Sequence, residues 1–230
     1  MNHYLYKLHH HIKLYLFGDE EQPVRCAGNS GKIQHHKSIE DAGACLQNEA
    51  LSMGKRIEAA HHLGVLAYTG GYVSGTMAAD YIPTMAELLP RQDLVDEHLV
   101  TLLQALSSVC YAHLANQARV CHLGVPAMLP IILTHGSPHS PLVKRWACYL
   151  MDVLCINNVP TIRALACTRG LQGSLEAIAE QDWDGWPKNH AAILLKILGF
   201  WPADKEADLE DGGDEEEGEM SGPTAHAHTP

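Results

Sequence analysis

Residues 120–151 read VCHLGVPAMLPIILTHGSPHSPLVKRWACYLM, and this stretch decides the fold. A short helix is expected from Pro126, because proline is tolerated in the first turn of a helix. A loop of Gly, Ser and Pro follows, and a longer helix is expected from Pro141. In that longer helix Val143 and Ala147 stand four residues apart, as apolar residues on one helical face do. The stretch therefore predicts one short helix followed by one long helix.

The same pattern occurs elsewhere in the chain. Residues 82–89 resemble residues 125–132 at an offset of 43 residues, and residues 171–178 fit the same frame 46 residues further on. One such unit cannot bury its own apolar face, but stacked units share a continuous core. The period therefore predicts an all-α solenoid of about three repeats. Its long helices are expected at 99–114, 142–156 and 191–200, and at 57–68 for an earlier, incomplete repeat.

The 230 residues divide into four expected parts. An amphipathic helix is expected at 1–18, where Tyr4, Leu8, Ile12 and Tyr15 share one face. A linker is expected at 19–37, and Ser38 is the expected N-cap of the helical domain at 38–202. Residues 203–230 are expected to be a disordered acidic tail. Within the domain, helices are expected at 38–53, 54–69, 76–89, 94–115, 117–123, 126–133, 141–157, 160–169, 171–180 and 188–200.

The negative charge is concentrated in the tail. The formal net charge of the chain is −11. Residues 204–219 hold ten acidic residues and one lysine, a net of −9, so that the rest of the chain carries only −2. The body is therefore nearly neutral, but it has no basic stripe of the kind that neutralises phosphates. We expect a protein or peptide partner and no nucleic acid.

The composition also indicates a cellular compartment. No apolar run reaches the ~20 residues of a membrane-spanning helix, and the N-terminus does not read as a secretory signal. The seven cysteines are dispersed and include no Cys-x-x-Cys pair. Reduced thiols in a cytoplasmic, possibly nuclear, protein are the simplest interpretation.

The repeat resembles the armadillo repeat. The residues that carry this resemblance are Gly124-Val125-Pro126, the loop that follows, and the helix with Val143 and Ala147. The resemblance covers roughly residues 40–200, and the chain is similar to the small armadillo-like helical domain-containing proteins. In armadillo families the third helix of each repeat lines a concave groove that binds extended peptides. The resemblance therefore implies an armadillo-like, right-handed α-solenoid of about three repeats. It also implies a non-enzymatic interaction module, adaptor or scaffold.

The expected groove involves residues 99–114 and 142–156. Importin-α-like armadillo proteins bind peptides through Trp and Asn ladders on these helices. In this chain Tyr149 stands where the Trp would fall, and Val153 stands where the Asn would fall. The candidate partner contacts in the groove are Gln104, His113, Lys144, Arg145 and Tyr149. The sequence therefore predicts an interaction surface without the standard ladder.

Two other functions stay open at this point. Sixteen histidines and seven cysteines allow a small metal-binding protein or hydrolase. However, adjacent histidines on a helix point ~100° apart, and no catalytic motif or metal-ligand spacing stands out. We therefore expect no catalytic residue, no metal site and no cofactor. The second alternative is docking on a membrane surface through the N-terminal helix.

The loop before the long helix contains two Ser-Pro pairs. Ser137 precedes Pro138, and Ser140 precedes Pro141. A phosphate near a helix N-terminus would be favoured by the helix macrodipole. Ser137 and Ser140 are therefore possible phosphorylation sites, and the alternative is an ordinary turn with good capping residues.

Overall fold

The computed structural model describes residues 30–134 and 136–200, and every regular element in this part of the chain is a helix. The all-α fold predicted from the repeat is confirmed. The elements are α2 (Ser30–Gln47), α3 (Met53–Thr69), α4 (Gly71–Ala78), the 3-10 helix η1 (Ala79–Tyr81), α5 (Ile82–Leu88), α6 (Asp96–Cys110), α7 (Leu114–His122), α8 (Val125–Leu133), α9 (Pro141–Cys155), α10 (Val159–Ala166), α11 (Leu171–Ala179) and α12 (His190–Ile197).

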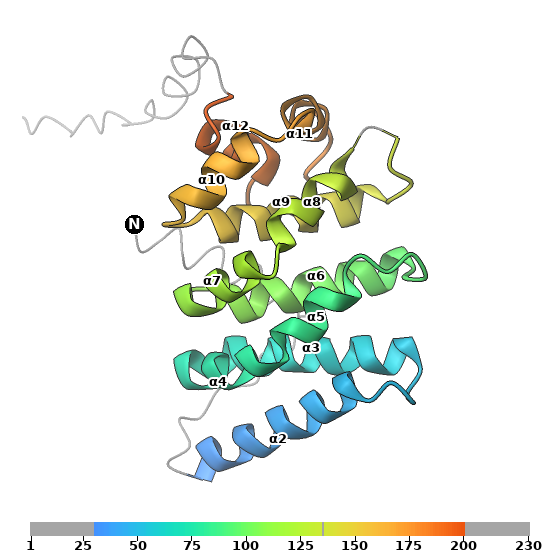
Figure 1. The fold of residues 1–230 in the computed structure, drawn as a ribbon, viewed down its shortest axis with the longest axis vertical. Coiled ribbons are helices and arrows are strands. Elements are labelled where there is room, and N and C mark those ends of the chain that lie inside the picture. Colours follow the sequence, from blue (N-terminus) through green and yellow to red (C-terminus); the bar gives the residue numbers. More distant parts are fainter. Residues whose placement is uncertain (1–29, 135, 201–230) are drawn as a thin grey trace, which may run out of the picture. The chain divides into compact units, whose positions relative to one another are not determined.

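The helices form repeats of three. Helices α4, α5 and α6 make one repeat, α7, α8 and α9 the next, and α10, α11 and α12 the last, while α2 and α3 are the second and third helices of a partial repeat. The long third helices α3, α6 and α9 lie side by side in chain order (Figure 1). Helix α12 continues this layer by packing on α9. Three full repeats and one partial repeat agree with the period of the sequence.

Prolines and glycines set the boundaries of several helices. Pro126, Pro141 and Pro160 each lie in the first turn of a helix, as expected. Gly124 and Gly170 precede α8 and α11 with φ angles of 78° and 79°. This left-handed conformation favours glycine, and it turns the chain sharply between the first and second helices of a repeat.

The first described helix begins earlier than predicted. Helix α2 begins at Ser30, so Ser38 lies inside a helix, and residues 30–37 of the expected linker are helical. Residues 32–37 contain no proline or glycine that would stop a helix. The helix ends at Gln47 instead of residue 53, because the Asn48 side chain accepts the Ala50 N–H at 3.0 Å and forms a turn. The expected amphipathic helix at 1–18 and the expected tail at 203–230 lie outside the described residues.

The expected helix at 76–89 is also wrong in detail. The chain forms α4, η1 and α5 there, and α4 already begins at Gly71. A 3-10 turn joins α4 to α5, because Pro83 has no N–H to continue a hydrogen-bonded helix and instead starts a new one.

Candidate functional site

Large apolar side chains are exposed where the third helix of one repeat meets the first helix of the next. Tyr72 and Val73, in the first turn of α4, are 70% and 63% exposed. Leu114 begins α7, Ile156 directly follows α9, and Val159 begins α10; all three are about half exposed. We call these five residues the corner surface. They occupy corresponding corners of three successive repeats.

Polar side chains join the first two corners. The His113 ring caps α7, because its Nδ1 accepts the Asn116 N–H at 3.3 Å. Its Nε2 therefore carries the hydrogen and donates to Thr76 Oγ1 on α4, at 3.2 Å. Asn116 Nδ2 donates to the Gly75 carbonyl at 2.9 Å. These bonds fix the start of α7 beside α4.

The same arrangement recurs one repeat later. The Asn158 side chain caps α10 by accepting the Thr161 N–H at 3.1 Å. Asn158 Nδ2 and Thr161 Oγ1 both donate to Cys121 Sγ on α7, at 3.3 and 3.4 Å. The first helices α4, α7 and α10 form one row, on the left of Figure 1. The residues of the corner surface lie in or just before the first turns of these helices.

A cavity of about 200 Å³ opens between the first two corners. Tyr68, Tyr72, Tyr111 and His113 provide its aromatic lining, and we call it the tyrosine pocket. Tyr72 stacks on His113 with a centroid distance of 4.5 Å, and Tyr68 meets Tyr111 edge to face at 5.2 Å. Small residues such as Gly75 and Ala112 line the rest of the cavity and leave the space open.

The tyrosine pocket is neutral and small. Burial raises the pKa of Tyr111, and burial together with the neighbouring Tyr111 raises the pKa of Tyr68. Both phenols are therefore uncharged at neutral pH. Cofactor and drug sites usually exceed ~300 Å³, so a cavity of this size suits a single side chain.

Comparison with known proteins agrees with this architecture. The family model described as armadillo-like helical domain-containing protein 2 matches residues 2–202. The chain belongs to this family. The resemblance to small armadillo-like helical domain-containing proteins is thus confirmed. No curated protein matches the chain. Armadillo-like helical domains serve in general as protein-interaction modules and are typically non-catalytic.

The partner contacts predicted from the sequence of this armadillo-like domain differ in their exposure to solvent. Gln104 on α6 and Lys144 and Arg145 on α9 are half-buried. The Arg145 guanidinium lies 5.8 Å from the centroid of the Trp183 ring. His113 lines the tyrosine pocket but is only 4% exposed, and its ring nitrogens bond to Asn116 and Thr76 as described above. His113 therefore shapes the pocket rather than reaching toward a partner.

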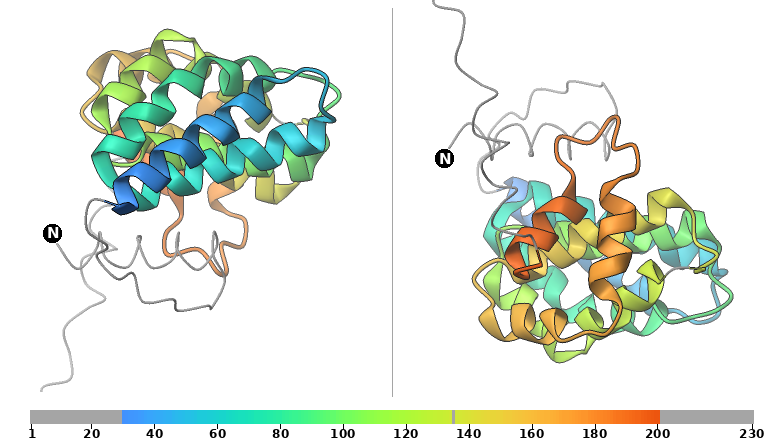
Figure 2. Two further views of the ribbon diagram at one scale, coloured as in Figure 1. Left: turned by 90° about the horizontal axis from the view of Figure 1, so that it is seen from below. Right: turned by 90° about the horizontal axis from the view of Figure 1, so that it is seen from above.

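Tyr149 is not available to a partner, because it is only 2% exposed. Trp146 and His190 contact its ring edge to face, at 5.6 and 4.9 Å. The loop between α11 and α12 extends beyond the helices in Figure 2. Its Trp186 ring lies 4.9 Å from Trp146 and 6.4 Å from Tyr149 on α9, and His190 is the first residue of α12. His190 Nδ1 donates to Asp152 Oδ2 at 2.9 Å, and the His190 side chain is 1% exposed. Tyr149 on α9 thus belongs to the core where the last repeat of the armadillo-like domain packs on the repeat before it.

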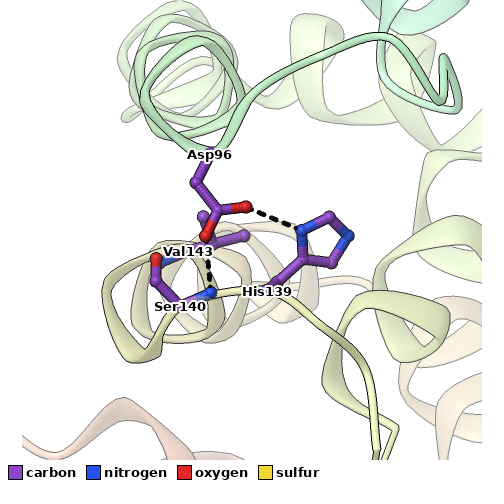
Figure 3. A network of polar contacts seen from close by, with 4 residues as sticks. All are labelled: Asp96, His139, Ser140 and Val143. Atoms are coloured by element: carbon purple, nitrogen blue, oxygen red, sulfur yellow. Dashed lines mark hydrogen bonds and ion pairs between the residues drawn. The ribbon is translucent and has the colours of Figure 1, made fainter.

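The Ser-Pro loop contacts α6. Asp96, in the first turn of α6, accepts the Ser140 N–H through Oδ2 at 2.6 Å and bonds to His139 Nδ1 through Oδ1 at 2.9 Å (Figure 3). We call Asp96, His139 and Ser140 the clasp. Ser140 is also the N-cap of α9, where its Oγ accepts the Val143 N–H at 3.5 Å. Ser137 is half-buried in the same loop.

Two findings concern metal binding and membrane spanning, whereas the N-terminal helix expected to dock on a membrane surface lies outside the described residues. Across residues 30–134 and 136–200, no three His, Cys, Asp or Glu side chains converge as a metal site requires. Among the helices in these ranges, none combines the length and apolarity needed to cross a membrane.

Sequence reasoning missed Tyr68, Tyr72 and Tyr111. A signal for them exists in the repeat, since Tyr68 and Tyr111 stand 43 residues apart near the ends of consecutive long helices. This offset equals the repeat period that led to the fold. The indicative pattern is an aromatic residue repeated at the end of a long helix, where polar turn residues are usual.

Proposed function

We propose that the protein is a non-enzymatic interaction module or adaptor that binds an extended segment of a partner protein along the corner surface. The observation that carries this proposal is the row of exposed apolar side chains beside the tyrosine pocket. Scattered apolar residues on a surface are normal, but apolar residues repeated at corresponding positions of adjacent repeats provide a continuous contact line for a partner.

The tyrosine pocket favours a particular chemistry in the partner. Its phenols are neutral, and its remaining lining is small and mostly apolar. It therefore suits an apolar side chain, with proline favoured because aromatic-lined grooves commonly bind proline-containing extended peptides. Tyrosine supplies a large, rigid contact area, which is a frequent feature of residues that dominate binding energy.

The groove first expected over residues 99–114 and 142–156 is the less favourable location. Two of its five candidate contacts, His113 and Tyr149, are buried, whereas Gln104, Lys144 and Arg145 are half-buried and none of the three lines the tyrosine pocket. The corner surface instead exposes Tyr72, which is 70% accessible and adjoins a cavity. We therefore assign partner binding to the corners.

A cytoplasmic or nuclear location is part of this proposal. Cys45, Cys110, Cys121, Cys148, Cys155 and Cys167 form no disulfide, as is usual in a reducing compartment. The partner is proposed to be a protein, because the corner surface is built from apolar and aromatic side chains instead of the clustered lysines and arginines that bind nucleic acid.

The experiment is a selection of peptides from a display library on the purified full-length protein. We expect enriched peptides to carry proline or another apolar residue as their anchor. The double substitution Tyr72→Ala with Leu114→Ser is expected to weaken their binding by more than tenfold. Ile131→Ser is the matched control, because Ile131 on α8 is 68% exposed but lies away from the corners, and it is expected to leave binding unchanged.

Two results would overturn the proposal. One is a set of selected peptides that bind the double variant as tightly as the original protein. The other is equal loss of binding in the Ile131→Ser control. Circular dichroism of each variant establishes that a loss of binding does not reflect unfolding.

A further inference from the structure

The loop between α8 and α9 combines a phosphorylation motif with a charged contact. Ser140 is followed by Pro141, and both Pro141 and Leu142 are exposed, so a kinase has access to the residues that follow the serine. The clasp holds the Ser140 backbone 2.6 Å from the Asp96 carboxylate. We propose that Ser140 is phosphorylated by a proline-directed protein kinase and that the phosphate opens the clasp between α6 and α9.

The modification is an ordinary phosphoryl transfer from ATP. The Ser140 Oγ attacks the γ-phosphorus of ATP and forms a new P–O bond. The bond between that phosphorus and the bridging oxygen breaks, and ADP leaves. The hydroxyl proton passes to the catalytic base of the kinase. The substrates are therefore the folded protein and ATP, and the products are phosphoserine and ADP.

Two contacts determine the effect of the phosphate. The first is repulsive, because phosphorylation would place a charge of about −2 on Ser140, and the backbone N–H of this same residue donates to the ionised Asp96 carboxylate. The second is attractive, because Ser140 is the N-cap of α9, and the exposed N–H groups of a helix start bind anions. Lys144 and Arg145 on the next turn add positive charge to this end of the helix. The phosphate therefore replaces Asp96 as the anion at the start of α9.

The consequence is local. Helix α9 keeps an N-terminal cap, whereas Asp96 loses the Ser140 N–H and the His139 ring that it binds in the clasp. The loop from residue 136 to residue 140 is then released from α6. Because the clasp is distinct from the tyrosine pocket, this inference is independent of the proposed binding function.

The test uses the full-length protein, a proline-directed kinase and magnesium ATP, with mass spectrometry to locate the phosphate. The Ser137→Ala variant keeps Ser140, and the Ser140→Ala variant keeps Ser137, so each Ser-Pro pair controls for the other. We expect phosphate on Ser140 in the first variant. Phosphate confined to Ser137, or found on neither serine, overturns the proposal.

The structural effect is measured by hydrogen exchange. We expect the amides of Ser140 and of the first turn of α6 to exchange at least tenfold faster after phosphorylation, while α3 stays unchanged. In the Asp96→Asn variant the repulsion is absent, and phosphorylation is expected to produce little further change. Unchanged exchange in the phosphorylated original protein, or an equal increase in Asp96→Asn, overturns the proposed opening of the clasp.

Discussion

A Cβ atom on Gly64 would lie 2.9 Å from the Cα of Ala105, and this close approach joins α3 to α6. Ala105 is 1% exposed, and its carbonyl oxygen and Ser108 Cβ would lie 3.2 and 3.3 Å from the same atom. The nearest obstacle is backbone, which cannot rotate away as a side chain can. The glycine therefore determines how closely these two long helices pack.

Gly64→Ala is expected to destabilise the protein. The extra methyl group overpacks the interface between α3 and α6 and costs about 1–3 kcal/mol. This cost exceeds the gain in helix propensity, which is at most ~1 kcal/mol. Urea denaturation followed by circular dichroism measures the change in unfolding free energy.

Gly173 on α11 provides the control for that prediction. A Cβ atom there meets nothing within 4 Å, so Gly173→Ala is expected to stabilise the protein by about 0.4–1 kcal/mol. Stabilisation by both substitutions would show that α3 and α6 are not closely packed at Gly64.

The sequence predicts most of the helices because the determining signals are local. Prolines such as Pro126 and Pro141 mark the first turns, and apolar residues at helical spacing mark the buried faces. The boundaries near Ser38 and Met53 are wrong because a serine caps a helix only where the preceding chain is not helical. Residues 32–37 contain no residue that would prevent the helix from extending back to Ser30.

The candidate site is much less predictable, because it depends on contacts between distant residues. Tyr149 is at the expected position for a groove contact, but Trp186 and His190, about 40 residues later, fold over it. His113 is also at an expected contact position, but its two ring nitrogens are hydrogen-bonded to Thr76 Oγ1 and to the Asn116 N–H. A repeat pattern identifies equivalent positions, but it does not determine which of them a later loop will cover.

The clasp is expected to contribute to stability only while Asp96 is ionised. Burial tends to raise the pKa of Asp96, but hydrogen bonds from His139 and Ser140 outweigh this effect and lower the pKa below its ordinary value. A carboxyl group with a lowered pKa in the folded state stabilises it above the unfolded pKa of ~3.9, and this contribution is lost as the pH falls through the folded value.

Asp96→Asn is therefore expected to lower the unfolding free energy at pH 7 by about 0.5–1 kcal/mol, a modest amount because Asp96 is partly solvated. The difference from the original protein should shrink below pH ~4. Denaturation curves at pH 7, 5 and 3 measure it, with Asp41→Asn on the exposed side of α2 as the control. A difference that is independent of pH would exclude an electrostatic role for the clasp.

The cysteines are expected to react at very different rates. Burial raises the pKa of Cys110 and Cys148, which are fully buried, and burial with the nearby Asp152 and Cys121 raises the pKa of Cys155 to about 12. Because the thiolate is the nucleophile, these three thiols should resist iodoacetamide in the folded protein. Cys45 and Cys167 are exposed and should react first.

Peptide mapping by mass spectrometry measures the rate at each cysteine. The rates are expected to become similar in denaturant, which provides the control for intrinsic reactivity. Rapid labelling of Cys148 without denaturant would mean that the packing around α9 opens readily.

The His190–Asp152 bond is expected to hold the loop between α11 and α12 against α9. His190→Phe keeps a ring beside Tyr149 but removes the Nδ1–H that Asp152 accepts at 2.9 Å. This hydrogen bond is partly buried and is accepted by a charged group, and such bonds contribute about 1.5–3 kcal/mol. Ile197→Ala on the same helix is the control, since Ile197 is 37% exposed and its truncation should cost less.

Denaturation followed by tryptophan fluorescence reports directly on this region, because the Trp186 ring lies 5.9 Å from His190. Equal stability of His190→Phe and the original protein would mean that ring packing alone holds the loop in place.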